Sequence, residues 1–495
     1  MVMCYLPYGA FILGGSYPIL PHPAPFYHIN TKSSLLKKLK VTAVFDIGKT
    51  NKKFFLFDKN FKEVYREYSR FEEIEDEDGY PTEDLAALQS WLKDLFHRIL
   101  DTEEYDVKAI NFSTYGASFV HLDADGEVVT PLYNYLKEID PEIENSFYNR
   151  YGPESEISTK TGSPKSGLLN SGLQLYWLKH TQPGVFKKIK YSLHLPQYLS
   201  YVFTGIPLSE YTSIGCHTAL WDYEKKDYHE WVYAEEIHKI LPPIVSTETS
   251  INMNYNGKRI KIGVGIHDSS SALIPYIRGS KKPFVLVSTG TWSVSLNPYS
   301  KTLLNEQELR DDCINYMRIN GKAVKSSKLL LGNEYKHQVT FLSEQYKVPY
   351  EKHIEVKFDY ETYKKIESNF KPCFHWKYLN AGDATQETTL THSTYEQAYH
   401  QLLIELTHIQ VNNILAAKGG DASIKRLFVD GGFSDNDVFI KLLSHYLRDM
   451  KLLSTSSSLG SALGAAIVIS DSKLNSKFLK ENYALKKHVP FIIGG

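Results

Sequence analysis

The chain has 495 residues, of which 42% are hydrophobic and 23% are charged, and its formal net charge is −1. This length suits about two or three domains that each bury a core. The net charge close to zero argues against a nucleic-acid partner bound through a basic face. The lack of an apolar stretch of about 18 residues argues against a membrane span. Four scattered cysteines without CxxC spacing predict reduced thiols in a cytoplasmic protein.

Residues 1–40 differ in composition from the rest of the chain. They are rich in Pro, Gly and Tyr up to about Tyr27, and basic residues follow the apolar ones instead of preceding them. Prolines would interrupt a helix here, and the order of charge is wrong for a signal peptide. We therefore expect a non-core N-terminal extension, with a weak export signal as the alternative.

Residues 41–58 read as a strand, a turn containing Gly48, Lys49, Thr50 and Asn51, and a second strand. Small turn residues let backbone and hydroxyl donors converge on one point, a geometry that suits phosphate oxygens. Residues 63–69 predict a third strand and residues 72–79 a solvated acidic loop. Thr82 is expected to cap a helix that ends near Leu100.

The strand predicted over residues 107–113 runs directly into Thr114, Tyr115, Gly116 and Ala117. Ligands of open α/β sheets bind at the carboxyl ends of strands, so hydroxyl and aromatic groups here suit a polyol. The alternative is a plain bend between strands. Helices are expected over residues 141–151, 171–180 and 183–204, the last with a break at Pro196, and a polar loop over 211–218.

A strand over residues 258–265 is followed by His267 and Asp268, and small residues then open a helix. A carboxylate in that position suits a catalytic base, and it equally suits a helix N-cap. His267 alone favours a structural or hydrogen-bonding role.

Residues 284–295 repeat the pattern of strand, turn and strand, with Ser288, Thr289, Gly290 and Thr291 in the turn. An ordinary hairpin is the alternative. Two such hairpins predict a duplicated protein with a nucleotide in the cleft between a first domain at residues 41–275 and a second at 276–495.

The second half also contains an expected irregular, charged excursion over the cleft at residues 301–390 and a long amphipathic helix over 394–417. A strand over 424–429 leads into Asp430, Gly431 and Gly432, which predict a nucleotide-binding turn. A helix of small residues is expected over 460–466.

Taken in this order, these segments resemble the FGGY carbohydrate kinases, a branch of the actin-like ATPase superfamily, over about residues 41–470. Residues 46–51 look like the first phosphate loop, 288–292 like the second, 265–268 like the segment of the catalytic base, and 430–436 like the adenosine loop. Two departures are Gln174, where the family usually has Lys, and the second family signature, for which Leu331–Glu334 is only a distant candidate.

The resemblance implies an α/β fold of two actin-like (ribonuclease-H-like) domains and ATP-dependent phosphorylation of a sugar hydroxyl. It implies Asp268 as the general base and Asp46 as the residue that holds Mg²⁺. The ATP-binding residues that it implies are Gly48, Lys49, Thr50, Asn51, Ser288, Thr289, Gly290, Thr291, Gly431, Gly432, Ser434 and Asn436. The sugar-binding residues that it implies are Thr114, Tyr115, Gly116, Ala117, His267 and Asp268.

Within the family, residues 114–116 resemble the Thr-Trp-Gly or Thr-Phe-Gly of the rhamnulose and fuculose kinases, although Ser118 replaces their usual Asp. This similarity implies a 6-deoxyketohexose, L-fuculose or L-rhamnulose, as the substrate. The alternatives are a pentulose kinase, a catalytically dead sugar sensor and a non-catalytic ATP-binding regulator. The combination of residues 114–116 with Asp268 argues against the regulator. The presence of Asp268 argues against the sensor. A sugar and ATP are the expected partners, and a homodimer is an expected assembly.

Overall fold

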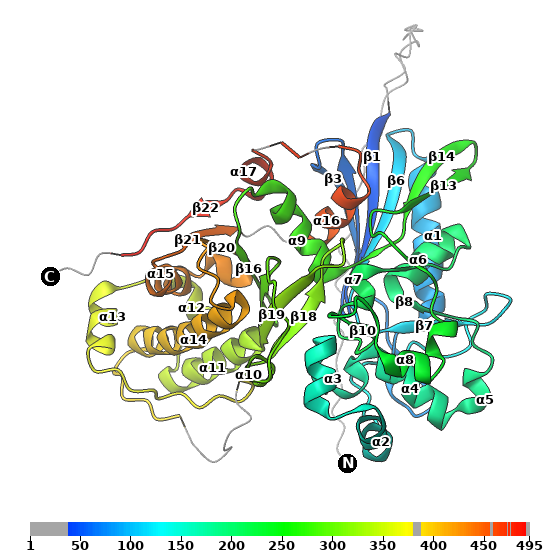
Figure 1. Cartoon of the computed structure of the whole chain (residues 1–495). Helices are drawn as coiled ribbons and strands as arrows, with labels where there is room; N and C mark the ends of the chain where they lie inside the picture. The colour runs from blue at the N-terminus through cyan, green and yellow to red at the C-terminus, as the bar shows by residue number, and fades with distance from the viewer. Residues whose placement is uncertain (1–37, 380–387, 456–458, 473, 476, 492–495) are drawn as a thin grey trace, which may run out of the picture. The chain divides into compact units, whose positions relative to one another are not determined.

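The computed structural model describes residues 38–491 apart from 380–387, 456–458, 473 and 476 (Figure 1). The predicted extension at residues 1–40 therefore lies almost wholly outside the described residues. In this described part, no helix has the length and apolar character needed to cross a membrane.

The first half of the chain forms a mixed seven-stranded sheet in the order β13-β14-β6-β1-β2-β3, with β15 also paired to β6. β1 runs parallel to β6 and antiparallel to β2, and β14 and β15 are parallel to β6. Its strands are β1 (Leu39–Ile47), β2 (Lys52–Asp58), β3 (Glu63–Ser69), β6 (Tyr105–Thr114), β13 (Ser250–Tyr255), β14 (Lys258–Gly263) and β15 (Ile266–His267).

The second half forms another seven-stranded sheet, in the order β18-β19-β17-β16-β20-β21-β22. β16 is antiparallel to β17 and parallel to β20, as β1 is to β2 and β6. Its strands are β16 (Val285–Thr289), β17 (Ser293–Asn297), β18 (Cys313–Met317), β19 (Ala323–Leu329), β20 (Arg426–Gly431), β21 (Lys451–Thr455) and β22 (Lys486–Lys487). The repeated order confirms the predicted α/β fold with two similar halves.

Helices cover both faces of each sheet. The first half contains α1 (Leu85–Asp101), α2 (Pro141–Tyr151), α3 (Glu154–Thr161), α4 (Ser171–Thr181), α5 (Pro183–Phe186), α6 (Leu195–Thr204), α7 (Tyr211–Ile214), α8 (Glu230–Ala234) and α9 (Asp268–Gly279). The second half contains α10 (Glu306–Arg310), α11 (Leu331–Tyr346), α12 (Lys352–Glu355), α13 (Tyr360–Glu367), α14 (Tyr395–Lys418), α15 (Asp437–Tyr446), α16 (Gly460–Val468) and α17 (Phe478–Tyr483).

The remaining elements are short. They are β4 (Ile74–Glu75), β5 (Pro81–Thr82), β7 (Phe119–Leu122), β8 (Tyr191–His194), β9 (Ser209–Glu210), β10 (Trp221–Asp222), β11 (Asp227–Tyr228), β12 (Ile244–Val245) and the 3₁₀ turns η1 (Gly167–Leu169), η2 (Ile237–Lys239) and η3 (Gly432–Asp435).

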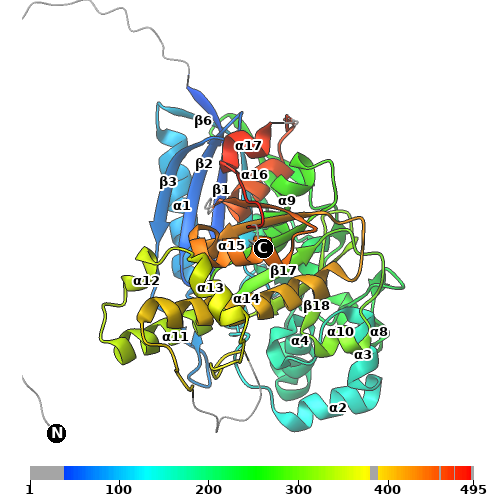
Figure 2. The ribbon, with the colours of Figure 1, turned by 90° about the vertical axis from the view of Figure 1, so that its left-hand side faces the viewer.

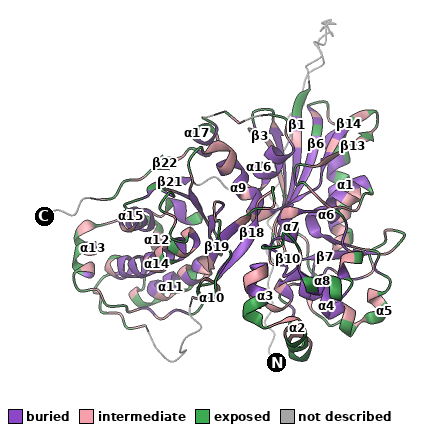
Figure 3. Cartoon of the chain, in the orientation of Figure 1, coloured by how far each residue is buried: buried purple, intermediate pink, exposed green. Residues whose placement is uncertain are grey.

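The cores follow from the alternation of side chains along the strands. On β2, Phe54 and Leu56 join the core beneath α1 and α6, whereas Phe55 and Phe57 join a second core on the opposite face. Because both faces are buried, the strand is a continuous apolar run. The second core also takes residues of α9, α16 and the second sheet, so α9 and α16 lie between the two sheets (Figures 1 and 2). The buried interiors of both sheets are visible in Figure 3.

Several predicted elements need correction. The N-cap of α1 is Asp84 and not Thr82, because the Asp84 carboxylate accepts a hydrogen bond from the Ala87 N–H while Thr82 pairs in β5. Residues 183–204 are not one helix, since β8 separates α5 from α6, and Pro196 lies in the first turn of α6, where its missing N–H costs nothing.

Three segments predicted to be irregular are ordered. Residues 211–214 form the single turn α7, capped by the Glu210 carboxylate. Residues 301–390 include β18 and β19, which extend the second sheet, as well as α10 to α13, so the predicted irregular structure is wrong for residues 306–367. The acidic loop at 72–79 is not merely solvated, because Asp76 is buried and bonded to Lys137.

Candidate active site

Asp268 stands where β15 ends and α9 begins. It is the first residue of α9, and its Oδ1 accepts hydrogen bonds from the Ser269 N–H at 2.5 Å and the Ser269 hydroxyl at 3.2 Å. The side chain is 35% exposed, so one face of the carboxylate is open to a ligand. Asp268 is thus the first residue of the helix and not its N-cap, which is His267, so the predicted N-cap role is wrong, and the role of base stays a prediction.

The second hairpin lies against the end of β20. The Thr289 hydroxyl donates to the Asp430 carbonyl at 2.5 Å and accepts from the Phe433 N–H at 3.1 Å. Gly431 has φ of +83°, and a Cβ there would stand 1.8 Å from the Thr289 carbonyl oxygen. The residue must therefore be glycine, which lets the two loops predicted to bind nucleotide touch through their backbones.

A cavity of about 380 Å³, here called the central hollow, brings the predicted base and the second loop together. Its lining includes Asp268, Ser288, Thr289, Gly290, Thr291, Trp292, Asp430, Gly431, Gly460 and Ser461. Gly48, Lys49, Thr50 and Asn51 are not among the lining residues. The hollow therefore unites the base with one of the two predicted phosphate loops.

A second cavity of about 410 Å³, here called the side hollow, shares Gly290 with the central hollow. Gly432 and Asn436 line it, together with Tyr335 of α11 and Gly332. The Asn436 amide donates to the Tyr399 hydroxyl at 2.8 Å, which orients it. Ser434 is buried and does not line the side hollow. The described chain also has a cavity of about 780 Å³ at residues 362–401, which no predicted site residue lines.

The turn between β1 and β2 is closed by a hydrogen bond from the Gly48 N–H to the Asn51 carbonyl at 3.0 Å. The Lys49 ammonium pairs with Glu73 at 2.8 Å, and the Asn51 side chain accepts from Arg70 at 2.8 Å. Thr50 lies between them at the exposed tip. In this arrangement the polar side chains of Lys49 and Asn51 are engaged with the chain's own charged groups.

A buried ion pair that the sequence did not reveal lies beneath this turn. The Lys52 ammonium contacts both Glu83 carboxylate oxygens, at 2.7 and 2.8 Å, and donates to the Lys49 carbonyl at 3.0 Å. Glu83 in turn accepts from the Tyr115 hydroxyl at 3.5 Å. Lys52 thereby connects the first predicted phosphate loop to the predicted sugar loop.

The predicted sugar loop packs tightly against His267. A Cβ on Gly116 would stand 2.8 Å from the His267 Nε2, so glycine permits this approach. Ala117 adopts a left-handed φ of 58°, and its carbonyl accepts from the Gln174 amide at 2.6 Å. The buried Thr114 hydroxyl donates to the Tyr115 carbonyl. Gln174, the departure from the family pattern, therefore holds the loop in place.

His267 is enclosed. Its Nε2 lies 3.4 Å from the Asp268 carboxylate and 3.3 Å from the Cys216 sulfur, and its ring stacks on Tyr316. Burial lowers the pKa of His267 although the neighbouring carboxylate opposes the shift. A neutral imidazole beside Asp268 suits hydrogen bonding to a hydroxyl more than proton transfer.

Asp46 is buried in β1, 3.8 Å from the Lys53 ammonium. Burial raises the pKa of its carboxyl, the Asp268 carboxylate acts in the same sense, and Lys53 opposes them. Two carboxylates in one region with incomplete neutralisation fit a hard cation such as Mg²⁺, which binds through one or two carboxylates together with phosphates and water.

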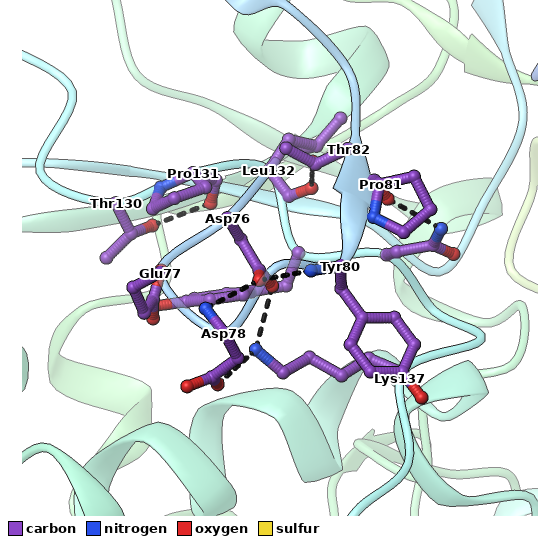
Figure 4. A network of polar contacts seen from close by, with 12 residues as sticks. Asp76, Glu77, Asp78, Tyr80, Pro81, Thr82, Thr130, Pro131, Leu132 and Lys137 are labelled. Atoms are coloured by element: carbon purple, nitrogen blue, oxygen red, sulfur yellow. Dashed lines mark hydrogen bonds and ion pairs between the residues drawn. The ribbon is translucent and has the colours of Figure 1, made fainter. Parts of the chain in front are cut away.

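Tyr135, which the sequence did not single out, lies beside the predicted sugar loop. Its ring centroid lies 6.2 Å from that of Tyr115, and burial, helped by the Asp268 charge, raises the pKa of its phenol. Two residues later, the Lys137 ammonium contacts Asp76 at 2.7 Å and Asp78 at 2.6 Å (Figure 4). This network ties the segment that carries Tyr135 to the acidic loop; only the aromatic and charged composition of residues 133–137 could have signalled it.

Two family models match the chain. The N-terminal domain of the FGGY family of carbohydrate kinases matches residues 41–273, and the C-terminal domain of carbohydrate kinase FGGY matches residues 281–477. A curated rhamnulokinase from Mannheimia succiniciproducens is 27% identical over 244 residues, which cover 48% of this chain and 48% of that protein. That match spans about half the length of the relative.

Solved structures are similar over most of the chain. A carbohydrate kinase from Novosphingobium aromaticivorans has a TM-score of 0.70 at 20% identity, covering 90% of this chain and 96% of that one. A ligand-bound xylulose kinase from Lactobacillus acidophilus has a TM-score of 0.72 at 16% identity, with 92% and 94% covered. These likenesses show the fold, and the two family models show that the chain belongs to the FGGY family of carbohydrate kinases.

Proposed function

We propose that the protein transfers the γ-phosphoryl group of ATP to a hydroxyl of a ketose. The observation that carries this proposal is the central hollow, where the Asp268 carboxylate faces the same space as the turn of residues 288–291 and the end of β20. Phosphoryl transfer needs alignment and charge neutralisation rather than covalent catalysis. The carboxylate can align the attacking hydroxyl and accept its proton, and the charge of the phosphates has to be met by backbone donors and cations.

In this mechanism Asp268 accepts the proton of the attacking sugar hydroxyl. Residues 288–291 and 431–432 would contact the phosphates, and the side hollow would take the adenosine against Gly432 and Asn436. Asp46 would hold Mg²⁺, which supplies charge neutralisation to the phosphates when bound. Tyr115, Gly116 and His267 would contact the sugar. Gly48, Lys49, Thr50 and Asn51 would also face the phosphates, and the Lys49 ammonium can join them only if it leaves Glu73.

We infer a 6-deoxyketohexose, L-rhamnulose or L-fuculose, as the substrate, in keeping with residues 114–116 and with the rhamnulokinase similarity. The domain boundaries at residues 41–275 and 276–495, a cytoplasmic location and a homodimer stay predictions that belong to this proposal.

The first experiment measures ADP release with L-rhamnulose, L-fuculose, L-xylulose, L-ribulose, D-xylulose and glycerol. A clear preference for a 6-deoxyketohexose is expected. Turnover with a pentulose alone would keep the kinase and replace the substrate class, whereas tight ATP binding without turnover on any sugar would favour the regulator.

A second experiment tests the base directly. Asp268→Asn should lower sugar-dependent ADP release by about 10²-fold or more, because an amide cannot accept the hydroxyl proton, while ATP affinity stays nearly unchanged. Asp84→Asn, a carboxylate that only caps α1, is the matched control and should keep full turnover because Asn caps helices as well as Asp does. Unchanged turnover in the Asp268 variant would remove Asp268 from the mechanism.

A further inference from the structure

Lys328 lies on the face of the second sheet that looks toward the first half. Side chains alternate along β19, and Val324, of the same parity as Lys328, lies in the core shared with α9 and α16. Ser327 points the opposite way and bonds to Asn413 of α14. Lys328 pairs across the ladder with Val294, which lines the central hollow.

The Lys328 ammonium is partly buried without a counter-ion. It lies 5.5 Å from the ring centroid of Trp292, in the second predicted phosphate loop. Among the residues that the structure describes, none accepts a hydrogen bond from it or forms an ion pair with it within 4.0 Å. This contrasts with Lys325 of the same strand, whose ammonium is bonded to Glu308.

The groups around it do not neutralise its charge. The Asp312 carboxylate acts on it from beyond ion-pair distance, and the Cys216 thiol and the His217 imidazole lie on the side of the first half. Burial lowers the pKa of Lys328 in spite of Asp312. A partly buried cation whose donors have no acceptor in the protein can bind an oxyanion that reaches it.

We propose that the Lys328 ammonium binds the oxygens of the γ-phosphate and neutralises the charge of the phosphoryl group during its transfer. Trp292, over which the ammonium lies, connects it to the loop that would hold the phosphates, and Cys216, which contacts His267, connects it to the sugar end.

The reaction itself is unchanged by this assignment, which rests on the proposed kinase function. The bond between the γ-phosphorus and the oxygen bridging to the β-phosphate breaks, a bond from the sugar oxygen to that phosphorus forms, and the hydroxyl proton passes to Asp268. Lys328 stays protonated and contributes only charge and hydrogen bonds.

The test compares the dissociation constants of AMP-PNP and ADP for the full chain and the variants Lys328→Met, Lys328→Arg and Lys322→Met. Lys328→Met should weaken AMP-PNP binding about tenfold and leave ADP binding within about twofold, because only AMP-PNP carries a γ-phosphate. Its kcat with the preferred ketose should fall about 10²-fold. Lys328→Arg should retain most of the AMP-PNP affinity. Lys322→Met, at an exposed lysine, is the matched control and should change neither the nucleotide affinities nor kcat.

Equal weakening of AMP-PNP and ADP would indicate a structural role and overturn the proposal, as would unchanged affinity for both. A rise confined to the KM of the sugar would also overturn it and place Lys328 at the sugar end of the site. If wild-type protein discriminates AMP-PNP from ADP through Lys328 but phosphorylates none of the ketoses, the proposed substrate fails while the Lys328 assignment holds.

Discussion

At the scale of single residues, the buried Lys52 decides how firmly the first turn is held. Lys52 and Glu83 are 2% and 5% exposed, and Lys52→Met would leave the Glu83 carboxylate buried without its cation. We expect the free energy of unfolding to fall by about 3–5 kcal/mol, measured by urea denaturation. The same variant should weaken sugar binding, because Tyr115 contacts Glu83.

Two comparisons keep this prediction specific. Lys225→Met removes an exposed partner of Glu230 and should cause no measurable loss. The double variant Lys52→Met with Glu83→Leu should recover much of the stability, because no unpaired charge remains. If the single variant is as stable as the wild type, the ion pair does not hold the turn.

Asp430 gives the protein a pH-dependent contribution to stability. Burial raises the pKa of its carboxyl to about 6, against about 3.9 in an unfolded chain. The folded protein therefore binds the Asp430 proton more tightly than the unfolded chain does. The stabilisation that this protonation contributes to the free energy of unfolding is complete below about pH 4 and is lost as the pH rises through about 6. Asp430→Asn removes the titration and keeps an acceptor for Tyr276, which donates at 3.1 Å.

Relative to the wild type, the Asp430→Asn variant should gain on the order of 3 kcal/mol of unfolding free energy between about pH 4 and pH 7. Denaturant unfolding of the ligand-free protein at several pH values measures this difference. Parallel curves for the two proteins would show that the Asp430 carboxyl is not perturbed.

Local residues of the site could be predicted from the sequence, and distant partners could not. Asp268 and His267 adjoin along the chain, and a strand followed by small residues places them at a sheet edge. Lys52 and Glu83, by contrast, are 31 positions apart, and Tyr135 reaches Tyr115 only through a loop anchored by Lys137. Such contacts depend on how elements pack, which no local pattern records.

At the scale of elements, the contact of α9 with α16 places Asp268. Gly464 lies against α9 so closely that a Cβ would stand 1.9 Å from the Ser271 carbonyl oxygen. Gly464→Ala should separate the helices, lower the free energy of unfolding by about 1–3 kcal/mol or more, and reduce turnover by displacing the base. Thermal unfolding and ADP release measure the two effects.

The same helix supplies the control. A Cβ on Gly460 would lie 3.5 Å from that of Ala272, an ordinary contact, so Gly460→Ala should keep or slightly raise stability. Equal stability of both variants would mean that the helices adjust without cost.

The sequence predicts helices and strands correctly where the spacing of apolar residues is regular, and it misses strands whose buried residues are polar. The 24-residue helix α14 has its N-cap at Thr394 and its C-cap at Gly419, as its pattern indicates. Strands β18 and β19 contain buried Asn315, Lys325, Ser326 and Ser327, which resemble a solvated segment in sequence. Ser327 bonds to Asn413 of α14, so the tertiary partner makes this strand possible.

At the scale of the whole molecule, the two halves contribute different parts of one site. The first half supplies Asp268 to the central hollow, and the second supplies the turn of residues 288–291 and the end of β20. The repeated strand order around β1 and β16 explains why two similar hairpins were visible in the sequence. The duplication predicted a ligand cleft between the halves, but no local pattern fixes how the halves pack, so the residues that meet at the central hollow came only from the resemblance.

This division predicts that nucleotide and sugar binding are coupled. A bound nucleotide that holds the second half against Asp268 would already order residues that the sugar contacts. Less free energy is then lost when the sugar binds, so saturating AMP-PNP should lower the sugar dissociation constant about 5–10-fold. Calorimetry with the preferred ketose measures this ratio. Linkage requires saturating sugar to strengthen AMP-PNP binding by the same factor, and ADP should couple more weakly because it does not reach Lys328. Identical sugar affinity with and without nucleotide would show that the two halves bind their ligands independently.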